Sequence, residues 1–192
     1  ITDKPYILDK SRGWGVHYNF LNNFYSEPKI ICLVRDLRSV YASMEKNFRK
    51  SQHMDSGIVN HATMSGTTTE KRIDIWANSQ PIGLAIERLS QIFKEGNNKN
   101  ILFIRYEDLA KNPKVEMKRV YDYLELPEYE HDFNNIEQIT QEDDSVYGIY
   151  GDHTIRKELK PLKSDYIEVL GQGACNWIKS NYKWFFDELK YY

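Results

Sequence analysis

Residues 29–43 read KIICLVRDLRSVYAS, and this stretch limits the folds that the chain can adopt. The apolar run from Ile30 to Val34 predicts a strand, and a helix is expected from about residue 37 to residue 49. A strand-to-helix junction presents free backbone N–H groups and the positive end of the helix dipole, which together bind phosphate. Arg35 adds a cationic fork at the end of the strand, and Ser43 adds a hydroxyl eight residues later. The stretch therefore predicts a phosphate-binding site.

The rest of the chain alternates between apolar runs of strand length and segments with helical spacing. Further strands are expected over residues 5–9 and 101–104. The expected helices cover residues 14–25, 67–93 with a break at Pro81, 113–125 and 165–186. The helix expected from residue 67 begins with Thr67 and Glu70 at capping-box spacing. This alternation indicates one α/β domain, with three α/β/α layers around a mostly parallel sheet.

Composition excludes several classes of protein. The net charge of −2 disfavours a nucleic-acid binder, and the sequence has no apolar run long enough to span a membrane. The first residues do not resemble a signal peptide, and the two cysteines, Cys32 and Cys175, are expected to be packing residues. These features favour a cytoplasmic protein. No metal is expected, because the five histidines lack ligand spacing: His17, His53, His61, His131 and His153.

Residues 30–43 resemble the 3′-phosphate-binding motif of sulfotransferases that use 3′-phosphoadenosine 5′-phosphosulfate (PAPS). In that motif an apolar strand is followed by an arginine and, eight positions later, by a serine. The sequence of this stretch is closest to that of the tyrosyl-protein and membrane-type members. The resemblance implies a P-loop nucleotide-binding superfamily fold, PAPS as co-substrate, and Arg35 and Ser43 as ligands of the 3′-phosphate. A protein-kinase catalytic loop is excluded, because it needs Asn five residues after Asp36, where Tyr41 stands.

A second landmark of the same family follows the strand at residues 101–104. In this family a strand ends in Tyr-Glu-Asp-Leu, followed by Asn/Asp-Pro and a helix that ends near Leu-Pro; here these pieces are residues 105–109, 112–113 and 123–127. The resemblance implies that Tyr106 contacts the adenine, although a tyrosine at a strand end can also be a packing residue. Glu107 and Asp108 are expected to cap the turn or to pair with Arg105.

A third landmark is the basic segment at residues 151–161. Sulfotransferases carry a late basic segment that folds over the nucleotide, and by this resemblance Arg156 is the first choice as a nucleotide ligand, followed by Lys157 and Lys160. Glu158 stands where several members have glycine. The alternative is a solvated basic loop.

Asp9, Lys10 and Ser11 form a fourth and weaker match, 26 residues before Arg35. Membrane-type sulfotransferases carry an acid-Lys-Ser/Thr sequence near this position, and the acid takes the proton of the acceptor. The resemblance thus implies Asp9 as general base and Lys10 as a stabiliser of charge on the transferring group. Asp9 can also be a turn residue, and His17 is a poorer candidate for the base.

The phosphosulfate-binding loop of the family is not found in residues 1–192, and residues 65–69 (SGTTT) read as a helix cap. We therefore expect a single sulfotransferase-like domain that lacks its first strand and that loop. Two alternatives are a kinase-type phosphotransferase and a non-catalytic nucleotide-binding remnant. The acceptor can be a small molecule, a carbohydrate or a peptide, and residues 51–66 and 128–150 are the expected acceptor-side loops.

Overall fold

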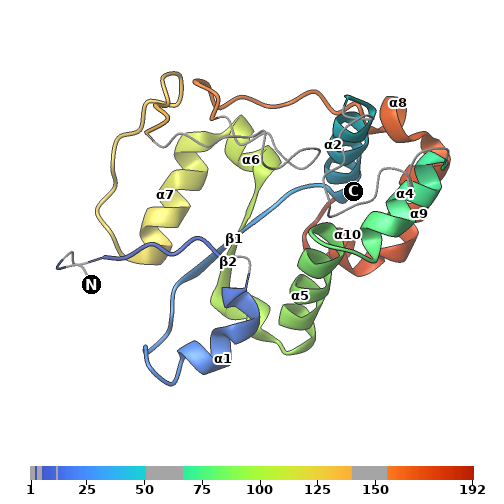
Figure 1. Ribbon diagram of the computed structural model, residues 1–192. Helices are drawn as coiled ribbons and strands as arrows, with labels where there is room; N and C mark the ends of the chain where they lie inside the picture. Colours follow the sequence, from blue (N-terminus) through green and yellow to red (C-terminus); the bar gives the residue numbers. More distant parts are fainter. Residues whose placement is uncertain (1–2, 4–5, 12, 51–66, 140–154) are drawn as a thin grey trace.

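The computed structural model of the chain describes residues 3, 6–11, 13–50, 67–139 and 155–192 (Figure 1). Its elements, in chain order, are η1 (Trp14–His17), α1 (Tyr18–Leu21), β1 (Ile30–Val34), α2 (Leu37–Lys50), α4 (Thr69–Ala77), α5 (Ile82–Lys94), η2 (Asn97–Asn100), β2 (Ile101–Arg105), α6 (Tyr106–Lys111), α7 (Pro113–Leu124), α8 (Tyr166–Leu170), α9 (Gln172–Asn181) and α10 (Lys183–Glu188).

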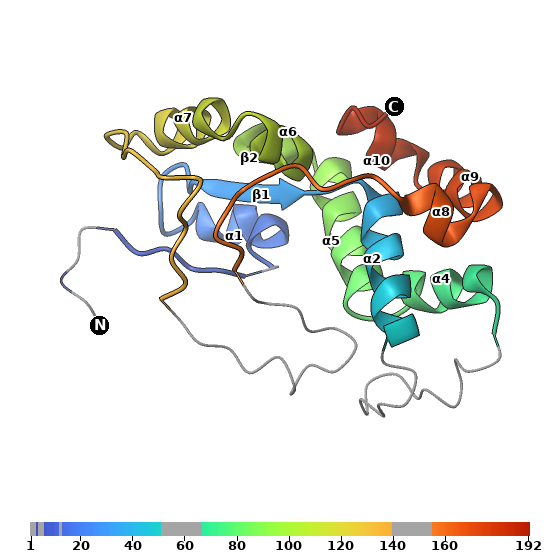
Figure 2. The same ribbon diagram turned by 90° about the horizontal axis from the view of Figure 1, so that it is seen from above.

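The two strands pair in parallel, as the alternation of strands and helices predicts. Ile30 lies opposite Ile101, and Val34 lies opposite Arg105. Figure 2 shows α6 and α7 on one side of these strands and α1 on the other, so the α/β class and its layers are confirmed. Because parallel strands end at the same edge of a sheet, the turn after β1 and the start of α6 meet there.

The expected strand at residues 5–9 is not present in the described part of this segment. Tyr6 to Asp9 belong to no helix or strand, and Tyr6, Ile7 and Leu8 are 68%, 77% and 92% exposed. A strand needs a neighbour to accept and donate its backbone hydrogen bonds. Within the described residues this segment has no strand partner, so its apolar sequence alone does not make it a strand.

Helix boundaries follow local capping chemistry more closely than apolar periodicity. Thr68, one residue after the expected cap, accepts a hydrogen bond from the backbone N–H of Lys71 at 3.2 Å and begins α4. The break expected at Pro81 separates α4 from α5. The single helix expected over residues 165–186 is instead three helices, because Gly171 has φ 83° and ψ 156°, which are not helical, and Tyr182 ends α9.

The core lies between α2, α4, α5, α9 and α10, where Tyr41, Trp76, Ile178 and Phe185 are almost fully buried.

A cluster of charged side chains on α2 and α4 lies beside this core. Glu45, with no exposed surface, accepts hydrogen bonds from Arg72 Nε at 2.8 Å and from Arg72 Nη2 at 2.6 Å. Arg49 Nε donates to the same carboxylate at 2.7 Å. Burial works to raise the pKa of Glu45, but these hydrogen bonds outweigh it, so its pKa lies below the ordinary value and the carboxylate is charged.

Candidate functional site

The centre of the candidate site is a contact between Arg35 and Tyr106, the residues that directly follow β1 and β2. The guanidinium carbon of Arg35 lies 5.0 Å from the centroid of the Tyr106 ring, which is cation–π geometry. Both side chains are half-buried. Ligands of open α/β sheets bind at this edge, beyond the carboxyl ends of the strands. The fold thus places a cation and an aromatic ring together at that edge.

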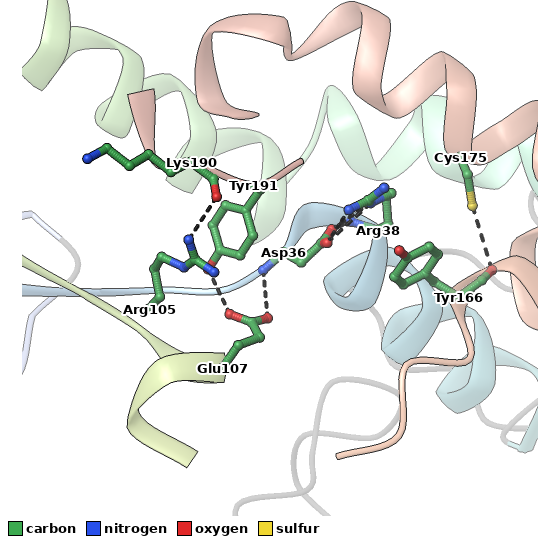
Figure 3. Close-up of polar contacts among 8 residues, drawn as sticks. All are labelled: Asp36, Arg38, Arg105, Glu107, Tyr166, Cys175, Lys190 and Tyr191. Carbon is green, nitrogen blue, oxygen red and sulfur yellow. Dashed lines mark hydrogen bonds and ion pairs between the residues drawn. The ribbon is translucent and has the colours of Figure 1, made fainter. Parts of the chain in front are cut away.

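The turn that carries Arg35 is held by hydrogen bonds to the next residue, Asp36. Its backbone N–H donates to Glu107 Oε1 at 3.1 Å, and its carboxylate accepts from the backbone N–H of Arg38 at 2.8 Å (Figure 3). The second bond satisfies one of the free amides at the start of α2, as a capping aspartate does. Glu107, at the first turn of α6, therefore joins the ends of the two strands.

Arg38 is the second cation of this turn, and its guanidinium is already bound within the protein. Its Nη2 lies 2.6 Å from Asp36 Oδ2, and its guanidinium carbon lies 4.5 Å from the Tyr166 ring and 5.2 Å from the Phe186 ring. The hydrogen bond to Asp36 raises the pKa of Arg38. Arg35, in contrast, forms no ion pair or hydrogen bond with any described residue. Arg35 is thus the cation of the turn whose N–H groups can serve a ligand.

Ser43 lies on α2 and is half-buried. No hydrogen bond links its hydroxyl to Arg35 in the part of the chain that the structure describes. Arg35 lies in the turn that precedes α2 and contacts Tyr106, whereas Ser43 lies within α2. The role of Ser43 as a phosphate ligand stays a prediction.

Asp9 and Lys10 are exposed and lie before η1. Asp9 Oδ1 accepts a hydrogen bond from Trp14 Nε1 at 2.9 Å, which fixes one oxygen of the carboxylate and leaves the other for an acceptor. Trp14 is also part of an open cleft beside η1, α1 and α5, which is lined by Ser11, Gly13, Trp14, His17, Phe20 and Arg88. Among the described residues, no hydrogen bond or ion pair joins Asp9 or Lys10 to Arg35, so their roles also stay predictions.

The late basic segment is described from Ile155 onward, and residues 151–154 lie outside the described part. Arg156, Lys157 and Lys160 are exposed. The backbone N–H of Ile136 donates to Lys157 O at 2.7 Å, and that of Leu159 donates to Phe133 O at 2.9 Å. The segment is thus attached to the chain that follows α7.

From there the segment crosses the molecule to α8, which packs against α2 (Figure 2). Lys46 of α2 pairs with Asp165 at 2.9 Å just before α8. Lys160 pairs with Glu158 at 2.8 Å, an exposed contact that a ligand can displace at little cost. Arg156 and Lys157 form no ion pair with a described residue, so the roles of all three cations stay predictions.

The described residues contain no cluster of three or more His, Cys, Asp or Glu side chains placed to hold a metal ion. Among the described helices none has the length and apolar character needed to cross a bilayer. The expected acceptor-side loop at residues 51–66 lies outside the described residues, as does residue 140 onward of the second one.

The sequence did not reveal how Glu107, Arg105 and Tyr191 act together near this site. Asp108 pairs with Arg105 at 3.1 Å, as expected, but Glu107 bonds to the turn after β1 and to Tyr191. No local pattern marks Tyr191, which follows the last helix. A contact between residues 84 positions apart depends on the packing of the whole chain.

Comparison with known proteins agrees with the motifs. The profile of the sulfotransferase domain matches residues 16–165. Carbohydrate sulfotransferase 1 of Homo sapiens is 24% identical over 165 residues, which cover 77% of this chain and 36% of that protein. Carbohydrate sulfotransferase 1 of Rattus norvegicus is 23% identical with the same coverage. The chain thus spans about a third of the length of the curated relatives it matches.

No solved structure matches the chain significantly. The domain profile nevertheless covers most of the chain, including β1, the Arg35 turn, β2 and the start of α6. The chain therefore belongs to the sulfotransferase family, and its α/β domain is of the P-loop nucleotide-binding superfamily.

Proposed function

We propose that the protein transfers a sulfuryl group from PAPS to a hydroxyl or amine of an acceptor. The observation that carries the proposal is the placement of Arg35 over Tyr106 at the carboxyl edge of the two strands. An arginine whose N–H groups have no other described partner suits a phosphomonoester, and a tyrosine ring beside it suits a purine. Family membership favours sulfuryl transfer over the kinase-type alternative.

In this proposal the nucleotide binds across the turn after β1. Arg35 and the amides at the start of α2 that Asp36 does not occupy hold the 3′-phosphate, Ser43 adds a hydroxyl to the same group, and Tyr106 packs on the adenine. The exposed cations of the late segment, Arg156, Lys157 and Lys160, then bind the phosphates from the other side. Each of these groups is a donor that suits phosphate oxygens.

The reaction is an in-line displacement at sulfur. The acceptor oxygen or nitrogen attacks the sulfur as Asp9 takes its proton, and the bond from sulfur to the 5′-phosphate oxygen breaks. The products are the sulfated acceptor and 3′-phosphoadenosine 5′-phosphate. Lys10 stabilises the charge that moves onto the transferring and leaving oxygens. Positioning and charge stabilisation supply most of the rate, and no metal is needed.

We propose a carbohydrate as the acceptor, because both relatives named above are carbohydrate sulfotransferases. The cleft beside Asp9 supports this choice. It offers the apolar faces of Trp14 and Phe20 together with the hydrogen-bonding groups of Ser11, His17 and Arg88. A largely apolar surface with a few polar groups is the usual composition of a small-molecule site. Small alcohols and peptides are the competing acceptors.

The proposal is tested by assaying sulfuryl transfer from PAPS to saccharides, a tyrosine peptide and a simple alcohol. The assay uses the longest natural form of the protein, with and without a chelator. Transfer to a saccharide, unaffected by the chelator and lost in Arg35→Ala, is the expected result. Binding of the nucleotide without transfer to any acceptor would support the non-catalytic remnant instead.

A cytoplasmic location is also part of the proposal. It rests on the two unpaired cysteines, and fractionation of cells tests it.

A further inference from the structure

Tyr191 follows α10 and turns back into the protein. Lys190 has φ 58°, and the backbone N–H of Tyr191 donates to Phe186 O at 2.9 Å, which is the arrangement of a Schellman motif. The Tyr191 side chain is 5% exposed and its ring stacks on that of Phe185, with centroids 5.6 Å apart. The left-handed residue thus directs a tyrosine into the core rather than into solvent.

The hydroxyl of Tyr191 reaches the turn that carries Arg35 through one carboxylate. It donates to Glu107 Oε2 at 2.8 Å, and Glu107 Oε1 accepts from the backbone N–H of Asp36 at 3.1 Å (Figure 3). A carboxylate that accepts at both oxygens has little freedom to rotate. Burial and the bond to Glu107 raise the pKa of Tyr191, so its hydroxyl remains a donor at neutral pH.

The same segment also holds the end of β2. Arg105 Nη1 donates to Lys190 O at 2.7 Å, and the Arg105 guanidinium lies over the Tyr191 ring at 4.6 Å from its centroid. Arg105 directly precedes Tyr106, the aromatic half of the candidate site. Residues 190–191 therefore contact both strand ends from which the site is built.

We propose that Tyr191 and Glu107 are positioning residues for the nucleotide: they fix the peptide between Arg35 and Asp36 and so keep Arg35 over Tyr106. The N–H that Glu107 binds belongs to the planar unit that also contains the Arg35 carbonyl, so holding it limits rotation about the Cα–C bond of Arg35. The role rests on the proposed nucleotide site. It does not follow from the family motifs, none of which includes Tyr191.

The test compares Tyr191→Phe with Tyr192→Phe. The first keeps the stacked ring and deletes only the hydroxyl bound to Glu107, and the second deletes a hydroxyl from a neighbour that is 88% exposed. Calorimetry with 3′-phosphoadenosine 5′-phosphate should show binding about three- to tenfold weaker for Tyr191→Phe and unchanged for Tyr192→Phe, the scale of one hydrogen bond. Glu107→Gln should retain more affinity than Glu107→Ala, because an amide can still accept from Asp36.

Two readouts separate positioning from general support of the fold. In the Arg35→Ala background, Tyr191→Phe should cost little further affinity, because the residue acts through Arg35. Hydrogen exchange at the Asp36 amide should be faster in Tyr191→Phe and unchanged in Tyr192→Phe. Equal affinity of the two phenylalanine variants, or a full additional loss in the Arg35→Ala background, would overturn the inference.

The nucleotide affinity of the unmodified protein is measured first, because this distinguishes failure of the proposed nucleotide site from failure of the role of Tyr191. If the unmodified protein shows no preference for the 3′-phosphate, the proposed nucleotide site is wrong, and the positioning role is wrong as well. With that preference present and the two phenylalanine variants alike, only the role of Tyr191 is wrong.

Discussion

Arg35 and Tyr106 are 71 positions apart in the sequence, yet the guanidinium of one lies 5.0 Å from the ring centroid of the other. The parallel register produces this contact, because Val34 lies opposite Arg105 and each site residue is the next one along its strand. A shift of the register by one residue would turn side chains to the opposite face and separate the pair. The sheet is thus part of the site and not only its support.

Arg35→Ala should weaken the binding of 3′-phosphoadenosine 5′-phosphate by about 2–3 kcal/mol, the scale of a lost charge-assisted contact. Arg35→Lys should lose less, because it keeps the charge but not the planar fork. Arg88→Ala, on α5, is the matched control and should bind the nucleotide normally. Equal affinity of Arg35→Ala and the unmodified protein in calorimetry would remove Arg35 from the site.

Asp9→Asn should leave nucleotide binding unchanged and lower turnover by about 10²- to 10⁴-fold, the usual contribution of a general base. Asparagine still accepts the hydrogen bond from Trp14, so the local structure is kept while the base is lost. The measurement is the rate of sulfuryl transfer at saturating PAPS. A fully active variant would place the base elsewhere in the protein.

Glu45 should make the stability depend on pH in acid. Its pKa in the folded state lies below the ordinary value of 4.5, so the unfolded chain binds the proton more tightly. Its contribution is therefore complete above pH 4.5 and is lost as the pH falls through the lower, folded-state pKa. Urea unfolding at neutral and acidic pH should show a smaller decrease for Glu45→Gln than for the unmodified protein.

Glu45→Ala should cost about 3–5 kcal/mol at neutral pH, because it leaves Arg72, with a side chain 10% exposed, without its carboxylate. Glu125→Ala is the control, since Glu125 pairs with Lys29 at an exposed position. An equal loss of stability in the two variants would show that the buried pair contributes no more than a surface one.

Lys190→Gly should stabilise the protein by up to about 1 kcal/mol. Lys190 has φ 58°, a conformation in which glycine is free of the strain of a side chain. Its interactions with the protein described here use backbone groups, which glycine retains. Thermal unfolding measures the effect. Lys183→Gly, at the first residue of α10, should instead destabilise, because it also removes the ion pair with Asp187. A fall in stability for Lys190→Gly would contradict the left-handed geometry at the end of α10.

Local sequence was sufficient to predict β1, β2, α2 and the junction that carries Arg35, because each has a clear apolar period and a local stop signal. The segment at residues 5–9 has the same apolar character, but a strand also needs a partner, and that depends on the rest of the fold. The apolar stripe of residues 165–186 continues across Gly171, whose backbone ends the helix there. Periodicity describes which side chains are buried but not where the backbone turns.

The candidate site, like the fold, was only partly predictable from the local sequence. Arg35 and Tyr106 follow from motif and register, so the sequence predicts both residues and their shared edge. Glu107 was expected to act locally, and instead it bridges Asp36 and Tyr191. Contacts of this kind arise from the packing of residues 190–191 against the strand ends and have no spacing signal in the sequence.

The most direct test of the central claim is calorimetric binding of 3′-phosphoadenosine 5′-phosphate, compared with 5′-AMP and ADP. The site assigned to Arg35 and Tyr106 predicts binding that requires the 3′-phosphate and that is weakened by Arg35→Ala. Equal binding of all three nucleotides, in this chain and in its longest natural form, would contradict the assignment of a 3′-phosphate site at the end of β1.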